Sequence, residues 1–411
     1  MRKLSSALVL SSTLVGSLGL AQGCSSKGPE HFFEDPTPAA DKGSAGGDGG
    51  AKRSVDGGAG PSFGNDAVDG QALLDDGSTC ASAVTAETHR DPVYLLFVVD
   101  GSGSMKDDNK WVAQTAALDA IFDDMLAQQD KDVGVGLVVF SDKLDPTQGS
   151  GPYPSSQDIF VSYVDQTQHD NLRARLDLSG ASGGTPTFPA MTGAYKELEN
   201  LVVAQPLPPN GRKVLVILTD GVPNTGGTQQ QCVDLTSTEL AKVGPRGPIL
   251  TFAVGVGRFP SSDPRNYDPA FMGNLAQAGG TAPAGCSPTE TSSAANLCHF
   301  QVTPNGKPVD QVKQDFVDAI NKIRGQVSSC EFTLERPDGG GTAVDPGKVN
   351  VIYTDGNGVQ HYVPQDPNSG WTYDDPAMPG KVVLNGSSCT QMKGDAKAKV
   401  TVQLGCKTKT N

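Results

Sequence analysis

An apolar run at residues 93–99 leads directly into the loop Asp100-Gly101-Ser102-Gly103-Ser104. The run predicts a buried strand. The glycines let the backbone turn, so that one carboxylate and two hydroxyls follow the strand within a short loop. Such oxygen atoms are the ligands that hard cations prefer, which indicates metal-dependent binding. An ordinary turn is the alternative, because Asp, Ser and Gly are common in loops.

Two further segments also place polar side chains in a glycine-containing loop. Residues 214–221 predict a second buried strand that ends in Thr219-Asp220-Gly221, and Thr185 follows two glycines just before a helix-like stretch at 189–201. In an open parallel sheet, ligands bind beyond the carboxyl ends of the strands, so polar loops at these ends converge. The sequence therefore predicts one cation site built from three loops.

These three segments resemble the von Willebrand factor A (VWA) domain and its metal-ion-dependent adhesion site, and the resemblance covers residues 91–328. It implies five metal ligands, some direct and some through water: Asp100, Ser102, Ser104, Thr185 and Asp220. It also implies Mg²⁺ as the cofactor, with Mn²⁺ or Ca²⁺ as substitutes. The implied partner is a protein whose Asp or Glu carboxylate completes the coordination of the ion.

The domain around this site is predicted to be α/β, a doubly wound, mostly parallel sheet flanked by helices (VWA/Rossmann-like). Strand-like runs at 133–140 and 249–254 alternate with helix-like runs at 111–129 and 309–327. This alternation is typical of a parallel sheet that is covered on both faces. The polar segments that follow the later strands, 222–231 and 258–267, are expected to lie on the metal face, where a partner meets the rim of the site.

The amino terminus predicts export. Arg2 and Lys3 precede an apolar core at residues 8–20, which is too short to span a membrane as a mature helix. Residues 21–24, Ala-Gln-Gly-Cys, resemble the lipobox of bacterial lipoproteins.

The lipobox resemblance implies a signal peptide at 1–23 and a lipid on Cys24 that anchors the protein in a membrane. Ser25 follows, which in Gram-negative sorting favours the outer membrane or cell surface. An ordinary secretory signal that is cut near the same place is the alternative.

Two segments flank the main domain. Residues 24–80 are rich in Gly and Asp and almost free of apolar periodicity, so we expect a disordered tether. Residues 330–411 contain short apolar runs between Pro, Gly and Asn turns, which predicts a small β-rich domain. A domain of this size needs disulfides to supplement its core.

Eight cysteines in an exported chain indicate disulfides rather than metal thiolates. If Cys24 carries a lipid, an odd number remains and at least one cysteine is unpaired. The candidate pairs are Cys80 with Cys330, Cys286 with Cys298, and Cys389 with Cys406.

The net charge and the absence of catalytic motifs argue against two classes of function. The net charge of −14 argues against nucleic-acid binding. The five histidines are isolated and none lies in a His-Glu-x-x-His helix, so we expect no enzyme. We expect an envelope protein that binds a protein or surface polymer through a divalent cation. A structural envelope protein, in which the metal only stabilises loops, is the alternative.

Overall fold

The computed structural model describes residues 84–86, 88–129, 132–141, 153–154, 158–178, 180–201, 207, 211–244, 247–260, 267–304, 306–334 and 344–410. The predicted signal peptide, the predicted lipidation site Cys24, the predicted tether at 24–80 and Cys80 lie outside these residues.

A six-stranded sheet forms the centre of the larger domain, in the order β5-β4-β3-β6-β7-β8. Its strands are β3 (Val93–Asp100), β4 (Val133–Phe140), β5 (Ile159–Tyr163), β6 (Arg212–Thr219), β7 (Ile249–Val256) and β8 (Phe300–Val302). Neighbouring strands are parallel, except that β5 pairs antiparallel with β4. The predicted α/β fold with a mostly parallel sheet is therefore confirmed.

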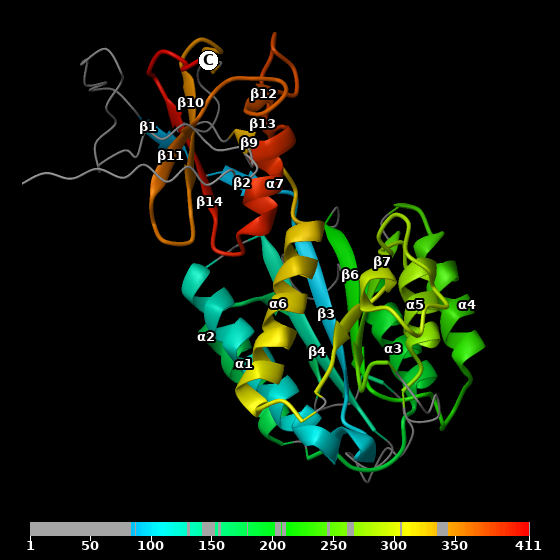
Figure 1. Ribbon diagram of the computed structural model, residues 1–411. Helices are drawn as coiled ribbons and strands as arrows, with labels where there is room; N and C mark the ends of the chain where they lie inside the picture. Colours follow the sequence, from blue (N-terminus) through cyan, green and yellow to red (C-terminus); the bar gives the residue numbers. More distant parts are fainter. Residues whose placement is uncertain are drawn as a thin grey trace, which may run out of the picture. The chain divides into compact units, whose positions relative to one another are not determined.

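Helices cover both faces of this sheet (Figure 1). One face carries α1 (Lys110–Gln128), α2 (Gln166–Asp177) and α6 (Val309–Val327), and the other carries α3 (Thr187–Glu199), α4 (Gln229–Leu240) and α5 (Pro269–Ala278). The 3-10 helices η1 (Gly103–Asn109) and η3 (Ala294–Asn296) lie in the connections. Gln229 already belongs to α4, so the predicted polar loop at 222–231 is shorter than we expected.

The central strand β3 explains why the sheet is buried on both sides. Alternate side chains point to opposite faces of a strand. Phe97 and Val99 pack in the core beneath α1 and α6, whereas Leu96 and Val98 pack in the core beneath α3. Each fully buried side chain of this kind contributes about 1.5–3 kcal/mol to folding. Burial on both faces requires the uninterrupted apolar run that the sequence displays.

The register of the parallel strands positions the ends of β3 and β6. Val99 pairs with Leu218, and Asp100 pairs with Phe140 of β4. Thr219, the last residue of β6, therefore lies beside Asp100, although 119 positions separate the two in the sequence.

The smaller domain consists of two antiparallel four-stranded sheets, β1-β14-β10-β11 and β12-β13-β9-β2. Its elements are β1 (Val84–Ala86), β2 (Thr88–Arg90), β9 (Glu331–Leu334), β10 (Val349–Thr354), β11 (Gln360–Val363), β12 (Trp371–Tyr373), β13 (Lys381–Leu384), α7 (Gly386–Gly394) and β14 (Lys399–Leu404). Strands β1 and β2 precede the larger domain in the chain, so residues 330–411 are only part of the β-rich domain. Three-residue strands are too short to give a periodic signal.

The disulfides differ in part from the sequence-based expectation. Cys286 is bonded to Cys298, as we expected, and Cys330 is bonded to Cys389. The expected pairs Cys80–Cys330 and Cys389–Cys406 are therefore wrong. Cys406 also forms a disulfide, and Cys232 is a free, buried cysteine.

Sheet pairing accounts for the Cys330–Cys389 bond. Cys330 immediately precedes β9, which pairs with β13, and β13 leads into α7, where Cys389 lies. The backbone N–H of Leu384 donates to the carbonyl of Cys330 at 2.9 Å, so the two cysteines meet with a Cα–Cα distance of 5.6 Å. The sequence did not predict α7, and this helix decides which cysteine Cys330 meets.

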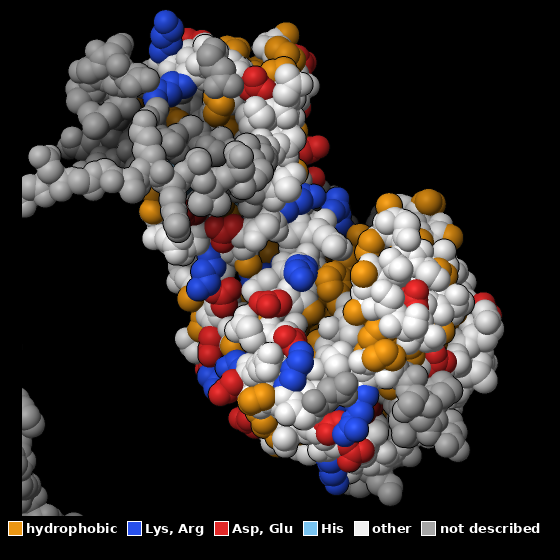
Figure 2. Space-filling view, viewed as in Figure 1, with side chains coloured by type: hydrophobic (Ala, Val, Ile, Leu, Met, Phe, Trp, Pro, Cys, Tyr) orange, Lys and Arg blue, Asp and Glu red, His pale blue; other side chains and the backbone are white. Residues whose placement is uncertain are grey.

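The visible surface mixes both signs of charge. Figure 2 shows acidic and basic side chains interspersed over the face that carries α1 and α6. Arg324 of α6 pairs with Asp124 of α1 at 3.2 Å, and Lys307 pairs with Asp315 at 2.5 Å. Within the described part of the chain, no helix is long and apolar enough to cross a membrane.

Candidate functional site

Asp100 ends strand β3 and is fully buried. Its Oδ1 accepts a hydrogen bond of 2.7 Å from the backbone N–H of Ser102, and its Oδ2 accepts one of 2.5 Å from the hydroxyl of Thr219. The side chain of Gln114, on α1, donates to the Asp100 carbonyl at 3.2 Å. The buried carboxylate needs the donors Ser102 N–H and Thr219 hydroxyl, because charge without partners is costly away from water.

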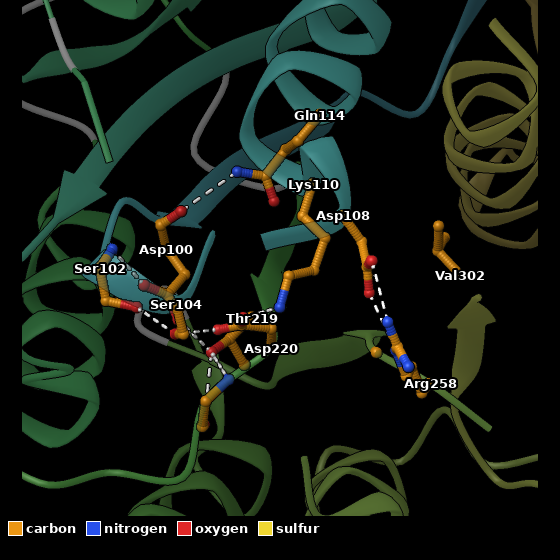
Figure 3. Close-up of polar contacts among 12 residues, drawn as sticks. Asp100, Ser102, Ser104, Asp108, Lys110, Gln114, Thr219, Asp220, Arg258 and Val302 are labelled. Carbon is orange, nitrogen blue, oxygen red and sulfur yellow. Dashed lines mark hydrogen bonds and ion pairs between the residues drawn. The ribbon is translucent and has the colours of Figure 1, made fainter. Parts of the chain in front are cut away.

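The two serines connect the first loop to the third. The Oγ atoms of Ser102 and Ser104 lie 3.1 Å apart, and the Ser104 hydroxyl donates to Oδ1 of Asp220 at 2.7 Å. Figure 3 shows Ser104 and Asp220 meeting from different loops. Asp220 directly follows the last residue of β6, so the register of β3 against β6 produces this contact.

Thr185 joins the site through a close approach to Gly221. A Cβ atom placed on Gly221 would lie 3.1 Å from Thr185 Oγ1 and 3.4 Å from Asp100 Oδ2. Both oxygens therefore face the same point, and any side chain at position 221 would crowd them. The predicted residues of all three loops thus lie together at the carboxyl edge of the sheet.

Backbone hydrogen bonds hold the second loop against the first. The N–H of Gly103 donates to the carbonyl of Gly183 at 2.9 Å, and the N–H of Ser182 donates to the carbonyl of Gly101 at 2.8 Å. These bonds need no ion.

Sequence reasoning missed four residues that support the predicted ligands. Asn224 accepts a hydrogen bond of 2.7 Å from the Thr185 N–H, and its own N–H donates to the Thr185 carbonyl at 3.2 Å. The other three are Thr219, Lys110 and Gln114. Among these four residues, only Thr219 has a recognisable sequence pattern, because it is a polar residue at the end of an apolar strand. The others reach the site from α1 or from a loop, and no local pattern marks them.

The two carboxylates influence each other. Burial, and then the nearby charge of Asp220, raises the pKa of Asp100. Burial also raises the pKa of Asp220, while the ammonium group of Lys110 acts in the opposite direction. Two buried acids close together gain stability from added positive charge.

The rim of the site carries an ion pair between two loops. Arg258, which follows β7, donates to both oxygens of Asp108 at 3.0 and 3.1 Å. Its side chain is 70% exposed. This is the rim position that was expected for the segment 258–267, of which residues 258–260 and 267 are described.

The donor set fits a hard divalent cation. The site offers two carboxylates and three hydroxyls, all of them oxygen ligands, and oxygen ligands are what Mg²⁺, Mn²⁺ and Ca²⁺ prefer. The described residues contain no cluster of three or more His, Cys, Asp or Glu side chains that could hold a metal ion.

Comparisons with known proteins agree with this architecture. The family model "von Willebrand factor type A domain" matches residues 95–287. No curated protein matches the chain.

Several solved structures resemble the chain at low identity. The pilus adhesin SpaC from Lactobacillus rhamnosus GG, in its open conformation, is 14% identical, with a TM-score of 0.42, over 78% of this chain and 40% of that one. A von Willebrand factor type A protein from Catenulispora acidiphila is 12% identical, with a TM-score of 0.37, over 79% of this chain and 61% of that one.

The manganese-loaded TRAP protein of Plasmodium vivax is 15% identical, with a TM-score of 0.34, over 66% of this chain and 91% of that one. Because the present chain spans 40% and 61% of the first two proteins, their length exceeds the shared region. The family match and the sheet topology together identify residues 95–287 as a von Willebrand factor type A (VWA) domain.

Proposed function

We propose that the VWA domain binds a protein or a surface polymer through a divalent cation. The proposed metal ligands are Asp100, Ser102, Ser104, Thr185 and Asp220. One observation carries the proposal: the 2.7 Å hydrogen bond between Ser104 and Asp220 joins separate loops through oxygen atoms alone. Mg²⁺ is the proposed ion, and Mn²⁺ and Ca²⁺ share its preference for oxygen.

The bound ion would supply a positive centre with a coordination position that an external ligand completes. The proposed ligand group is an Asp or Glu carboxylate of the partner. The loops that follow β3 and β6 carry four of the proposed ligands, and we propose that the Arg258–Asp108 ion pair contacts the same partner.

Binding, rather than catalysis, is the proposed activity. Each of the four histidines in the described part of the chain contacts residues away from the five proposed ligands. His89 contacts Asp132, His169 contacts Asp123, His299 contacts Tyr267 and His361 contacts Asp355. A nucleophilic serine mechanism needs a base, and these positions offer none to Ser102 or Ser104.

The proposed location is the cell envelope. This rests on the basic start, the short apolar core and the lipobox-like residues before Cys24. A lipid on Cys24 would anchor the chain in the outer membrane or at the cell surface.

Calorimetric titration of Mg²⁺, Mn²⁺ and Ca²⁺ into the EDTA-stripped mature chain tests the metal site. We expect saturable binding in the parent, none in Asp100→Ala, and parent-like binding in the control Asp177→Ala, which changes an exposed aspartate of α2. Equal binding by the parent and Asp100→Ala would overturn the proposed site.

A purely structural ion has less support. The first two loops are already held together by direct backbone hydrogen bonds, and Asp220 already has a lysine partner. Any ion that binds only the folded chain raises Tm. Partner binding by Asp100→Ala therefore separates the two roles: it is lost under the proposed function and kept if the ion only stabilises loops.

A further inference from the structure

Lys110 reaches into the carboxylate site from the first residue of α1. Its Nζ donates to Oδ2 of Asp220, while Ser104 occupies Oδ1 of the same carboxylate. The lysine side chain is 10% exposed and the Asp220 side chain is 0% exposed. Figure 3 shows the lysine extending from the helix toward Asp220, beside Asp100 and Thr219.

Helix energetics do not account for a lysine at this position. The amino terminus of a helix carries partial positive charge, which disfavours a cation in the first turn. Burial of the ammonium group adds a desolvation cost. The first turn of α1 also contains no acidic residue that would offset either effect. Asp220 is the group that compensates for both costs.

The charges around the lysine support the same assignment. When both are ionised, Asp100 and Asp220 place two negative charges in the site, and Lys110 supplies one positive charge to this buried pair. Asp107 adds a further negative charge near Asp220, while Asp108 is already engaged by Arg258. Lys110 is thus the cation that directly contacts the proposed metal ligands among the described residues.

We propose that Lys110 is a built-in counter-ion that competes with the divalent cation for Asp220. In the metal-free protein the ammonium group satisfies Asp220 and keeps the loops in place. A divalent cation that draws on Asp220 must displace the ammonium group from this carboxylate. Lys110 thereby lowers the metal affinity and lets the metal-free domain stay folded. The inference rests on the proposed metal site and concerns how that site is regulated.

The test compares two lysine variants of the EDTA-stripped mature chain. Lys110→Met removes the charge but keeps a long side chain. Lys106→Met removes the same charge from an exposed position of η1, which directly precedes α1, and is the matched control. Each protein is titrated with Mg²⁺ and with Mn²⁺ by calorimetry, and its Tm is measured with and without the ion.

We expect Lys110→Met to bind the ions about tenfold more tightly than the parent, within the usual range of coupling between two sites. Its metal-free Tm should fall below that of the parent, because two buried carboxylates lose their counter-ion, and saturating Mn²⁺ should restore it. Lys106→Met should match the parent in both measurements.

Equal or weaker metal binding by a folded Lys110→Met would overturn the inference and leave the proposed function intact. If the parent binds no ion but Lys110→Met does, the lysine has the proposed effect and the proposed function of the native chain fails. If neither binds, both proposals fail. If Lys110→Met folds neither with nor without Mn²⁺ while Lys110→Arg folds, the inference is again overturned, because the ion does not replace the lysine charge.

Discussion

The hydroxyl of Thr219 donates a 2.5 Å hydrogen bond to Oδ2 of Asp100 and accepts one of 3.0 Å from the N–H of Gly221. One threonine therefore ties the end of β6 to the end of β3 and fixes the start of the loop that follows β6. Asp100 and Thr219 are both completely buried, so water cannot replace the hydrogen bond between them.

Replacing Thr219 with Val should weaken the fold and the site together. Valine has the shape of threonine but no hydroxyl, which leaves a buried carboxylate oxygen without this donor. We expect a loss of about 1.5–3 kcal/mol in the free energy of unfolding, measured by urea denaturation without metal. Thr238→Val, at an exposed position where the hydroxyl bonds within its own helix, should change this quantity by less than about 0.5 kcal/mol. Similar losses in both variants would contradict the role of Thr219.

Stability should fall as the pH rises through the titration of Glu197. Burial raises the pKa of this residue of α3 to about 8. Its Oε1 accepts from the N–H of Val161 at 2.9 Å, and its Oε2 is enclosed without a partner among the described residues. Because the folded pKa lies above the ordinary glutamate value of 4.5, the contribution of neutral Glu197 to stability is complete below pH 4.5 and is lost as the pH rises to about 8.

The variant Glu197→Gln stays neutral at every pH and keeps an oxygen for Val161. We expect it to remove this decline, which is at most about 5 kcal/mol, from denaturation curves measured between pH 4.5 and 8. Glu290→Gln is the control, because hydrogen bonds lower the pKa of Glu290 to about 2 and the folded residue does not titrate in this range. A decline of unchanged size in Glu197→Gln would assign it to other groups.

The two described disulfides should differ in their contribution to stability. The chain between Cys330 and Cys389 spans 59 positions, and that between Cys286 and Cys298 spans 12. Loop-closure entropy predicts contributions of about 4 and about 3 kcal/mol, respectively. We therefore expect the double Ser variant of Cys330 and Cys389 to lose more unfolding free energy than that of Cys286 and Cys298. The reverse order in denaturant titrations would show that local packing outweighs chain entropy.

Local patterns in the sequence predicted the parts of the larger domain that depend on neighbouring residues. The apolar run before Asp100 and the run before Asp220 each require a strand buried on both faces. The polar residues that end these runs were enough to predict a site at the strand ends, and α6 was predicted over the span that it occupies. These features can be predicted because the periodicity of apolar residues and the burial it indicates are visible within a single segment.

Contacts between segments that are distant in the sequence could not be predicted from such local patterns. Cys330 meets Cys389 because β9 pairs with β13 and α7 follows, and Asn224 supports Thr185 through a loop with no distinctive pattern. Strands β1 and β2 are too short to be recognised until their partners are known.

The sequence by itself determined the fold class, because each segment records its burial pattern, and the resemblance of its three polar loops to the VWA metal site implied the five candidate ligands. Tertiary structure decided which groups surround those ligands. Lys110 starts a helix, and only the packing of α1 against the sheet brings its ammonium group to Asp220. The physical reason is that the free energy of a buried charge depends on partners distant in the chain, which the three-dimensional fold alone selects.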